Sequence, residues 1–179
     1  LIGSPSNPTG TIIEQAELAK IVDFVTARQG LFFSDEIYHG LVYEQGVASA
    51  LEFSDQVFVI NSFSKYFGMT GWRVGWLIVP EVFVPATEKL AQNIFISTSS
   101  HSQYAALAAF DKETLDELEC RRKDFKKKRD FLHSYLLELG FRIPVKPAGA
   151  FYIYADCSIF TDNSQQFAEQ LLESAGVAV

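Results

Sequence analysis

Lys65, Ser62 and Arg73 bring an amine, a hydroxyl and a guanidinium into one short segment of the chain. A lysine amine can form an imine with a carbonyl group, while a hydroxyl and a guanidinium can bind a phosphate through hydrogen bonds and charge. The segment directly follows an apolar run at residues 57–60. A phosphorylated aldehyde would match these groups, and pyridoxal phosphate is such a molecule.

Arg73 stands in a stretch that otherwise predicts a strand. Residues 72–79 are apolar apart from this arginine, and an unpaired charge on a strand with two buried faces would be costly. Arg73 therefore needs an anionic partner, either a buried carboxylate or the phosphate of a ligand. Gly68 and Gly71 favour the ligand, because glycines allow close backbone approach or positive φ between the preceding strand and Arg73.

A second cluster could complete a cofactor site. The apolar run at residues 31–34 is followed by Asp35, which predicts a buried parallel strand with an acid at its carboxyl end. Ligands of open α/β sheets bind outside these strand ends. Asp35 could pair with the protonated ring nitrogen of the cofactor, and Tyr38 could hydrogen-bond its phenolic oxygen. The alternative is that Asp35 caps the next element and Tyr38 packs at the rim.

A turn-forming segment at residues 4–11 precedes both clusters and contains Asn7-Pro8 followed by Gly10. By itself this is ordinary loop chemistry. In order and spacing, however, the three segments resemble the class I/II aminotransferases, the fold-type I family of pyridoxal phosphate enzymes. The resemblance extends from Ser4 to about Tyr154. Its motifs are Asn-Pro-x-Gly at residues 7–10, Asp-x-x-Tyr at 35–38, Ser-x-[Ser/Ala]-Lys at 62–65 and Gly-x-Arg-x-Gly at 71–75.

The resemblance implies a role for each side chain singled out above. Lys65 would be the Schiff-base lysine, and Asp35 would pair with the pyridinium nitrogen. Tyr38 and Asn7 would lie around the phenolic oxygen, and Ser62 and Arg73 would bind the phosphate. Lys65, Asp35 and Tyr38 would be the catalytic residues.

The reaction implied by the resemblance is a ping-pong transfer of an amino group between an amino acid and a 2-oxo acid. Lys65 would move the proton between the substrate Cα and the cofactor as general acid and base. The same apparatus also serves C–S lyases and enzymes similar to aminocyclopropane-carboxylate synthase. An aminotransferase-like sensor domain of a transcription regulator is a further alternative, against which the typical strings at residues 35–38 and 71–73 favour the enzyme.

The fold implied by the resemblance is α/β, with a mostly parallel sheet sandwiched by helices. Residues 1–111 would belong to a large cofactor-binding domain, and residues 112–179 would form an interdomain helix and part of a small α+β domain. Apolar spacing predicts a helix over residues 14–28 that covers the sheet. Further helices are expected at residues 82–96, 103–110, 112–139 and 163–174. The polar loop expected at residues 97–102 could reach a partner's site, with His101 as a loop residue and not a catalyst.

Two strands are expected in the small domain, at residues 141–143 and 151–154. In the family the Pro-x-Gly-Ala-Phe-Tyr segment, here at residues 147–152, lies near the substrate. Phe151 or Tyr152 could therefore line the pocket, or both could be simple core.

The chain of 179 residues is 48% hydrophobic, which is enough for a core in one or two domains. It starts at Leu1 without a methionine and stops at residues 175–179 as if entering another strand, so we expect it to be part of a longer protein. The resemblance places further phosphate-binding and cofactor-stacking groups upstream and the arginine for the substrate carboxylate downstream. Arg142 is not assigned that role.

Charge and cysteine content argue against other classes. The net charge of −7 and pI near 4.9 disfavour nucleic-acid binding. The basic run at residues 121–129 is interleaved with acids and predicts a solvated helix face. Cys120 and Cys157 lack metal-ligand spacing and are expected to be free thiols. No apolar run predicts a membrane span, so a cytoplasmic location is the default, and the family's homodimer with shared active sites is the expected assembly.

Overall fold

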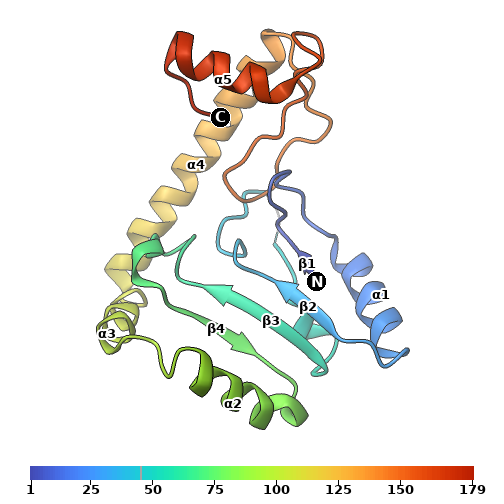
Figure 1. Ribbon diagram of the computed structural model, residues 1–179, viewed down its shortest axis with the longest axis vertical. Coiled ribbons are helices and arrows are strands. Elements are labelled where there is room, and N and C mark those ends of the chain that lie inside the picture. Colours follow the sequence, from blue (N-terminus) through green and yellow to red (C-terminus); the bar gives the residue numbers. More distant parts are fainter. Residues whose placement is uncertain (45) are drawn as a thin grey trace.

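The computed structural model describes residues 1–44 and 46–179. Its centre is a four-stranded sheet in the order β1-β2-β3-β4 (Figure 1). The strands are β1 (Ile2–Gly3), β2 (Phe32–Asp35), β3 (Val57–Ser62) and β4 (Gly75–Ile78). The first three run parallel, and β4 pairs antiparallel with β3. The predicted α/β fold with a mostly parallel sheet is confirmed.

Helix α1 (Gln15–Thr26) covers one face of the sheet, as its apolar spacing predicts. Leu18 and Val22 are buried in a cluster with Phe32, Val57 and Val59 from the two central strands. Fully burying one such side chain contributes about 1.5–3 kcal/mol. This cluster therefore fixes β2 and β3 side by side, which in turn sets where their carboxyl ends lie.

The segment after β3 differs from prediction at Arg73. A short 3-10 helix at Thr70–Trp72 ends on Arg73, which has the left-handed φ of 53°, and β4 begins only at Gly75. Arg73 therefore lies outside the strand and is exposed. The prediction of a strand with two buried faces over residues 72–79 was wrong, since every residue of β4 is partly open to solvent in the described structure.

Two helices follow the sheet. A 3-10 turn at Glu81–Phe83 leads into α2 (Val84–Ile94), close to the predicted helix at residues 82–96. Helix α3 (Ser100–Ala108) starts earlier than expected, so that His101 belongs to its first turn and not to a polar loop.

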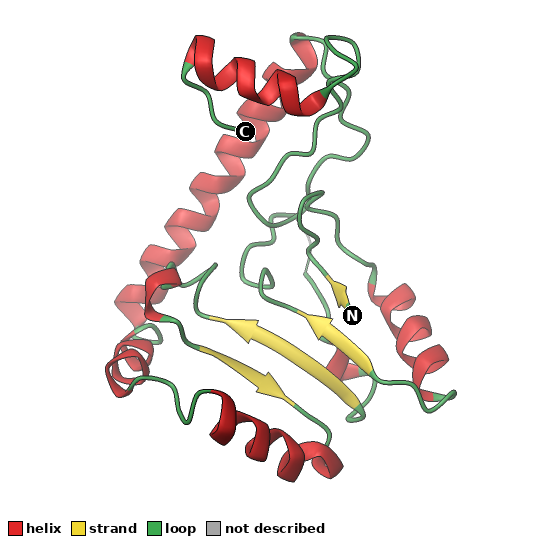
Figure 2. Cartoon of the chain, in the orientation of Figure 1, coloured by secondary structure: helices red, strands yellow, loops and turns green. Residues whose placement is uncertain are grey.

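The long helix α4 (Lys112–Glu138) runs from the sheet to the distant end of the molecule, where α5 (Ser164–Ala175) lies (Figure 1). Both helices match the predicted ranges closely. The strands predicted at residues 141–143 and 151–154 were wrong, because this part of the chain is loop (Figure 2). Within the described residues only isolated bridges occur there, Arg142 with Asp156 and Gly149 with Val42. Beyond α5, Gly176 takes the left-handed conformation and residues 177–179 form no strand.

Candidate active site

The carboxyl ends of the parallel strands gather the predicted side chains on one edge of the sheet. Asp35 ends β2 and pairs in register with Gly3 of β1, and Ser62 ends β3. The turn at residues 4–11 continues from β1, so Asn7 reaches the same edge. A cavity of about 240 Å³ at this edge is lined by Leu1, Gly3, Pro5, Ser6, Asn7, Asp35, Ile37 and Tyr38.

Tyr38 and Tyr152 meet through their hydroxyl groups, which lie 2.8 Å apart. The amide of Asn7 donates from Nδ2 to the Tyr152 oxygen at 3.4 Å. Tyr38 is buried, and its ring contacts the rings of Phe151 and Tyr152 edge to face at 5.6 and 5.9 Å. Tyr152 thus contacts two of the predicted site residues, and it also packs against the buried cluster of Tyr38, Leu41 and Ala150.

Lys65 approaches the same group of residues from the loop after β3. Its Nζ lies 5.7 Å from the ring centroid of Tyr38 and 5.6 Å from that of Phe151. At these distances the ring faces attract the ammonium group. The structure therefore brings together Lys65, Tyr38 and Phe151, which come from three separate segments of the chain.

Asp35 uses Oδ1 to accept the backbone N–H of Ile37 at 3.2 Å. This hydrogen bond is the capping role that was the alternative to a ligand-binding role, and the half-buried carboxylate still lines the cavity. The two roles are compatible, because a carboxylate has several lone pairs.

The two predicted phosphate ligands are placed differently. Half-buried Ser62 accepts the backbone N–H of Ser64 at 3.0 Å, and its Oγ lies 2.9 Å from that of Ser64. Exposed Arg73 donates from Nη1 to the carbonyl of Thr70 at 3.1 Å. No ion pair of Arg73 with a carboxylate occurs in the part of the chain that the structure describes, so its anionic partner is not a buried acid of these residues.

The loop that carries Tyr152 is held by the backbone of two other site segments. The carbonyl of Gly10 accepts the N–H groups of Ala148 and Gly149 at 2.9 and 3.0 Å, and Ala150 donates to Leu41 at 2.8 Å. Gly10 has a φ of +65°, and a Cβ there would lie 2.5 Å from that of Pro147. The segments of Asn7, Tyr38 and Tyr152 thus pack directly on one another.

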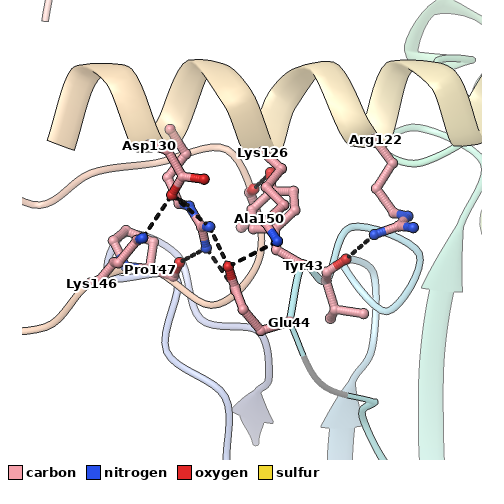
Figure 3. A network of polar contacts seen from close by, with 10 residues as sticks. Tyr43, Glu44, Arg122, Lys126, Asp130, Lys146, Pro147 and Ala150 are labelled. Carbon is pink, nitrogen blue, oxygen red and sulfur yellow. Dashed lines mark hydrogen bonds and ion pairs between the residues drawn. The ribbon is translucent and has the colours of Figure 1, made fainter. Parts of the chain in front are cut away.

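Helix α4 anchors this arrangement through the guanidinium groups of buried Arg129 and half-buried Arg122 (Figure 3). Arg129, whose side chain is 5% exposed, donates to both carboxylate oxygens of Glu44 and to the carbonyl of Pro147. About two turns earlier along the helix, Arg122 donates to the carbonyl of Val42 at 2.8 Å. The prediction of a solvated face for residues 121–129 was wrong at these two positions, because only the tertiary structure supplies their acceptors.

The network shifts the ionisation of its members. Hydrogen bonds from Arg129 hold the pKa of Glu44 below its ordinary value, and Lys146 does the same for the pKa of Asp130. Burial raises the pKa of Tyr38 well above the ordinary value of a phenol, and the negative charge of Asp35 acts in the same direction. The site therefore keeps the Tyr38 phenol protonated, as a hydrogen-bond donor must be.

Other expectations concern the whole chain. Cys120 and Cys157 are free, as predicted. Among the described residues no helix has the length and apolar character to cross a membrane, and no cluster of side chains is suited to hold a metal ion.

Comparisons with known proteins agree on one family. Residues 1–179 match the family model of aminotransferase class I and II. Valine–pyruvate aminotransferase of Mycobacterium tuberculosis is 41% identical over 181 residues, which cover 100% of this chain and 47% of that protein. The probable aspartate/prephenate aminotransferase of Aquifex aeolicus is 36% identical, with 100% and 48% covered.

Solved structures give the same result. An aminotransferase from Mycobacterium tuberculosis superimposes with a TM-score of 0.95 at 42% identity, covering 99% of this chain and 46% of that one. Aspartate aminotransferase from Thermus thermophilus with maleate has a TM-score of 0.93 at 32% identity, covering 99% and 47%. The chain spans about half the length of the curated relatives it matches.

Proposed function

The chain belongs to the class I and II aminotransferase family, and from this premise we propose that it carries the cofactor site of a pyridoxal-phosphate-dependent aminotransferase. The reaction is the transfer of an amino group between an amino acid and a 2-oxo acid. The observation that carries the proposal is the meeting of Lys65, Tyr38, Asn7 and Asp35 at the carboxyl edge of the parallel sheet. An amine, a carboxylate, a phenol and an amide are the groups that such a cofactor needs around its ring.

The side chains fit the cofactor by type and by placement. When bound, pyridoxal phosphate supplies an aldehyde carbon that a lysine amine holds as a Schiff base, and a ring that takes up the electron pair released at the substrate Cα. Lys65 would hold the aldehyde carbon, Asp35 the proton on the ring nitrogen, and Tyr38 and Asn7 the phenolic oxygen. Ser62 and exposed Arg73 would bind the phosphate, which supplies the anionic partner that Arg73 lacks among the described carboxylates.

The steps assigned to this chain are proton movements and charge stabilisation. The amine of Lys65 would accept the proton from the substrate Cα and act as general acid and base. The carboxylate of Asp35 would hold the proton on the ring nitrogen, which would favour electron withdrawal from the substrate. Running the same steps in reverse with a second 2-oxo acid gives a ping-pong cycle.

The resemblance supports the rest of the assignment. We propose a homodimer with shared active sites and a cytoplasmic location. Residues 1–111 would form the cofactor-binding part, and residues 112–179 would form an interdomain helix and part of a small domain. The start of α4 at Lys112 supports this proposed division.

Reduction with borohydride tests the assignment of Lys65. The protein, expressed from its complete gene, is incubated with pyridoxal phosphate and reduced, and its peptides are mapped by mass spectrometry. We expect the reduced adduct at Lys65, with no stoichiometric adduct at the exposed Lys128 on α4. A labelled protein without an adduct at Lys65 would contradict the site.

Product analysis separates the reaction types. With one amino donor and one 2-oxo acceptor, transamination yields a new 2-oxo acid without ammonia. Release of ammonia together with a thiol would instead indicate a C–S lyase, and a ring-containing amino acid would indicate a synthase. Cofactor binding without any turnover would point to a sensor domain.

A further inference from the structure

Tyr152 lies between the two side chains proposed to hold the phenolic oxygen of the cofactor. Its oxygen is 2.8 Å from the Tyr38 hydroxyl and 3.4 Å from Asn7 Nδ2. The half-buried Tyr152 comes from the loop after α4, whereas Tyr38 follows β2 and Asn7 follows β1. One hydroxyl therefore connects three segments of the site.

The chemistry of these groups gives the connection a direction. The Asn7 amide nitrogen can only donate, so the Tyr152 oxygen is the acceptor of that bond. The Tyr152 hydroxyl proton is then available for the Tyr38 oxygen. In this arrangement the Tyr38 proton is not used within the chain, and it can be donated to an acceptor in the cavity.

Hydrogen bonds in such a chain polarise one another, so each donor strengthens the next. A Tyr38 hydroxyl that accepts a bond from Tyr152 is a stronger donor than one that accepts none. Besides Tyr152, the charged groups that face Tyr38 are the carboxylate of Asp35 and the ammonium group of Lys65, 5.7 Å from its ring centroid.

The position of Tyr152 is fixed by the backbone around it. Ala150 is fully buried and donates to the carbonyl of Leu41, and its own carbonyl accepts the hydroxyl of Tyr43. The Tyr38 ring also makes edge-to-face contacts with the rings of Phe151 and Tyr152. A phenylalanine at position 152 would satisfy the packing alone, whereas the 2.8 Å bond between the hydroxyl groups requires a tyrosine.

We propose that Tyr152 is a positioning residue whose hydroxyl, held by Asn7, orients and strengthens the hydrogen bond from Tyr38 to the phenolic oxygen of the cofactor. This inference rests on the proposed function, and it assigns to Tyr152 a task beyond lining the pocket. A stronger bond from Tyr38 lowers the proton affinity of the link between Lys65 and the cofactor.

The test is the pH midpoint of the absorption band of bound pyridoxal phosphate, which follows the protonation of that link. We expect Tyr152→Phe to raise the midpoint by about 0.3 pH unit, because this variant weakens the bond from Tyr38 without removing it. Tyr38→Phe should raise it further. Tyr154→Phe, which removes an exposed phenol from the same loop, is the matched control and should leave the midpoint unchanged.

A double-mutant cycle separates positioning from a general disturbance. If Tyr152 acts through Tyr38, the midpoint of the double variant Tyr38→Phe, Tyr152→Phe should equal that of Tyr38→Phe alone. An unchanged midpoint in Tyr152→Phe, or shifts of the single variants that add in full, would overturn the proposal.

A second modification covers the case in which Tyr152→Phe does not fold. Incorporation of 3-fluorotyrosine at position 152 keeps the hydroxyl and makes it a stronger donor, so the midpoint should move downward. A move upward, or none, would contradict the proposal. Wild-type protein that shows neither a cofactor band nor an adduct at Lys65 would overturn the proposed function itself, whereas a labelled Lys65 with an unresponsive midpoint would remove only the role of Tyr152.

Discussion

Single residues of the site owe their environment to segments that are distant in the sequence. Tyr38 follows β2, yet its hydroxyl is bonded to Tyr152 and its ring faces the ammonium group of Lys65. Burial raises the pKa of this phenol, and the negative charge of Asp35 acts in the same direction. The reactivity of each side chain is therefore a property of the assembled site.

The Tyr38 phenol should titrate above its ordinary pKa of 10.0, because burial disfavours the phenolate. In Tyr152→Phe the midpoint should also stay above 10, since burial, the largest cause of the shift, remains after the bond to Tyr152 is lost. The measurement is a pH titration of the Cζ resonance of 13C-labelled tyrosine, assigned with Tyr38→Phe. A Tyr38 resonance that titrates like a tyrosine in a short peptide would contradict the buried hydroxyl pair.

Replacing Lys65 by alanine should abolish transamination without unfolding the protein. The half-buried side chain forms no ion pair among the described residues, whereas the proposed chemistry depends on its amine. We expect the turnover rate to fall more than about a thousandfold. The circular dichroism spectrum should match that of wild type, and Lys128→Ala serves as the control. Substantial turnover by Lys65→Ala would rule out its assigned role.

Secondary structure elements of this protein act as supports for loops. Helix α4 contributes no proposed catalytic group, but Arg122 and Arg129 bind the carbonyls of Val42 and Pro147. These contacts hold the segment after Tyr38 and the segment before Tyr152 against one helix (Figure 3). The geometry of the site therefore depends on an element that lies outside it.

Arg129→Ala should lower the free energy of unfolding by about 2 kcal/mol, because it removes a buried guanidinium that binds the partly exposed Glu44 and the Pro147 carbonyl. Lys128→Ala, which removes a 71% exposed charge paired with Asp124, should change it by about 0.5 kcal/mol or less. Chemical denaturation measures both. Equal effects of the two variants would show that the buried network does not stabilise the fold.

Gly10 joins the Asn7 turn to the loop of Tyr152, and an alanine there should be poorly tolerated. Its φ of +65° is unfavourable for a residue with a Cβ, which would also lie 2.7 Å from the carbonyl oxygen of Gly149. We expect Gly10→Ala to cost about 2 kcal/mol of stability. Gly71→Ala is the control, because a Cβ at Gly71 meets open space. Thermal unfolding that shifts equally in both variants would contradict this close packing.

At the scale of the whole molecule, buried phenols make the stability of the protein depend on alkaline pH. Burial raises the pKa of Tyr43 to about 12 and, together with the hydrogen bond to Glu119, the pKa of Tyr66 to about 12. Both residues hold loops near the sheet edge against the rest of the fold.

The free energy of unfolding should fall as the pH rises from about 10 to about 12. In this window the unfolded chain loses phenolic protons that the folded protein still holds, so proton loss favours unfolding. Below pH 10 these groups contribute their full stabilisation. Denaturation at a series of pH values measures the slope, and Tyr66→Phe should make it shallower. A slope that is zero for wild type would contradict the raised pKa values.

The sequence alone determined the family, the α/β class and the ranges of α1, α4 and α5. The spacing of apolar residues along a helix is a local property of the sequence. The motifs that contain Asp35, Tyr38 and Lys65 are likewise short, and their order along the chain is typical of one family. Their positions could therefore be predicted without knowledge of distant contacts.

The tertiary structure decided what depends on partners far along the chain. A strand needs another backbone to bond with along its length. Residues 148–150, just before the strand predicted at residues 151–154, bond instead to the loops at Gly10, Leu41 and Tyr43. Arg129 can be buried because it donates hydrogen bonds to the Pro147 carbonyl and forms an ion pair with Glu44, although its neighbours in the sequence are charged. The bond between Tyr38 and Tyr152 likewise joins groups that no local pattern relates. Pairing of this kind is set by the packing of whole segments, which local spacing does not encode.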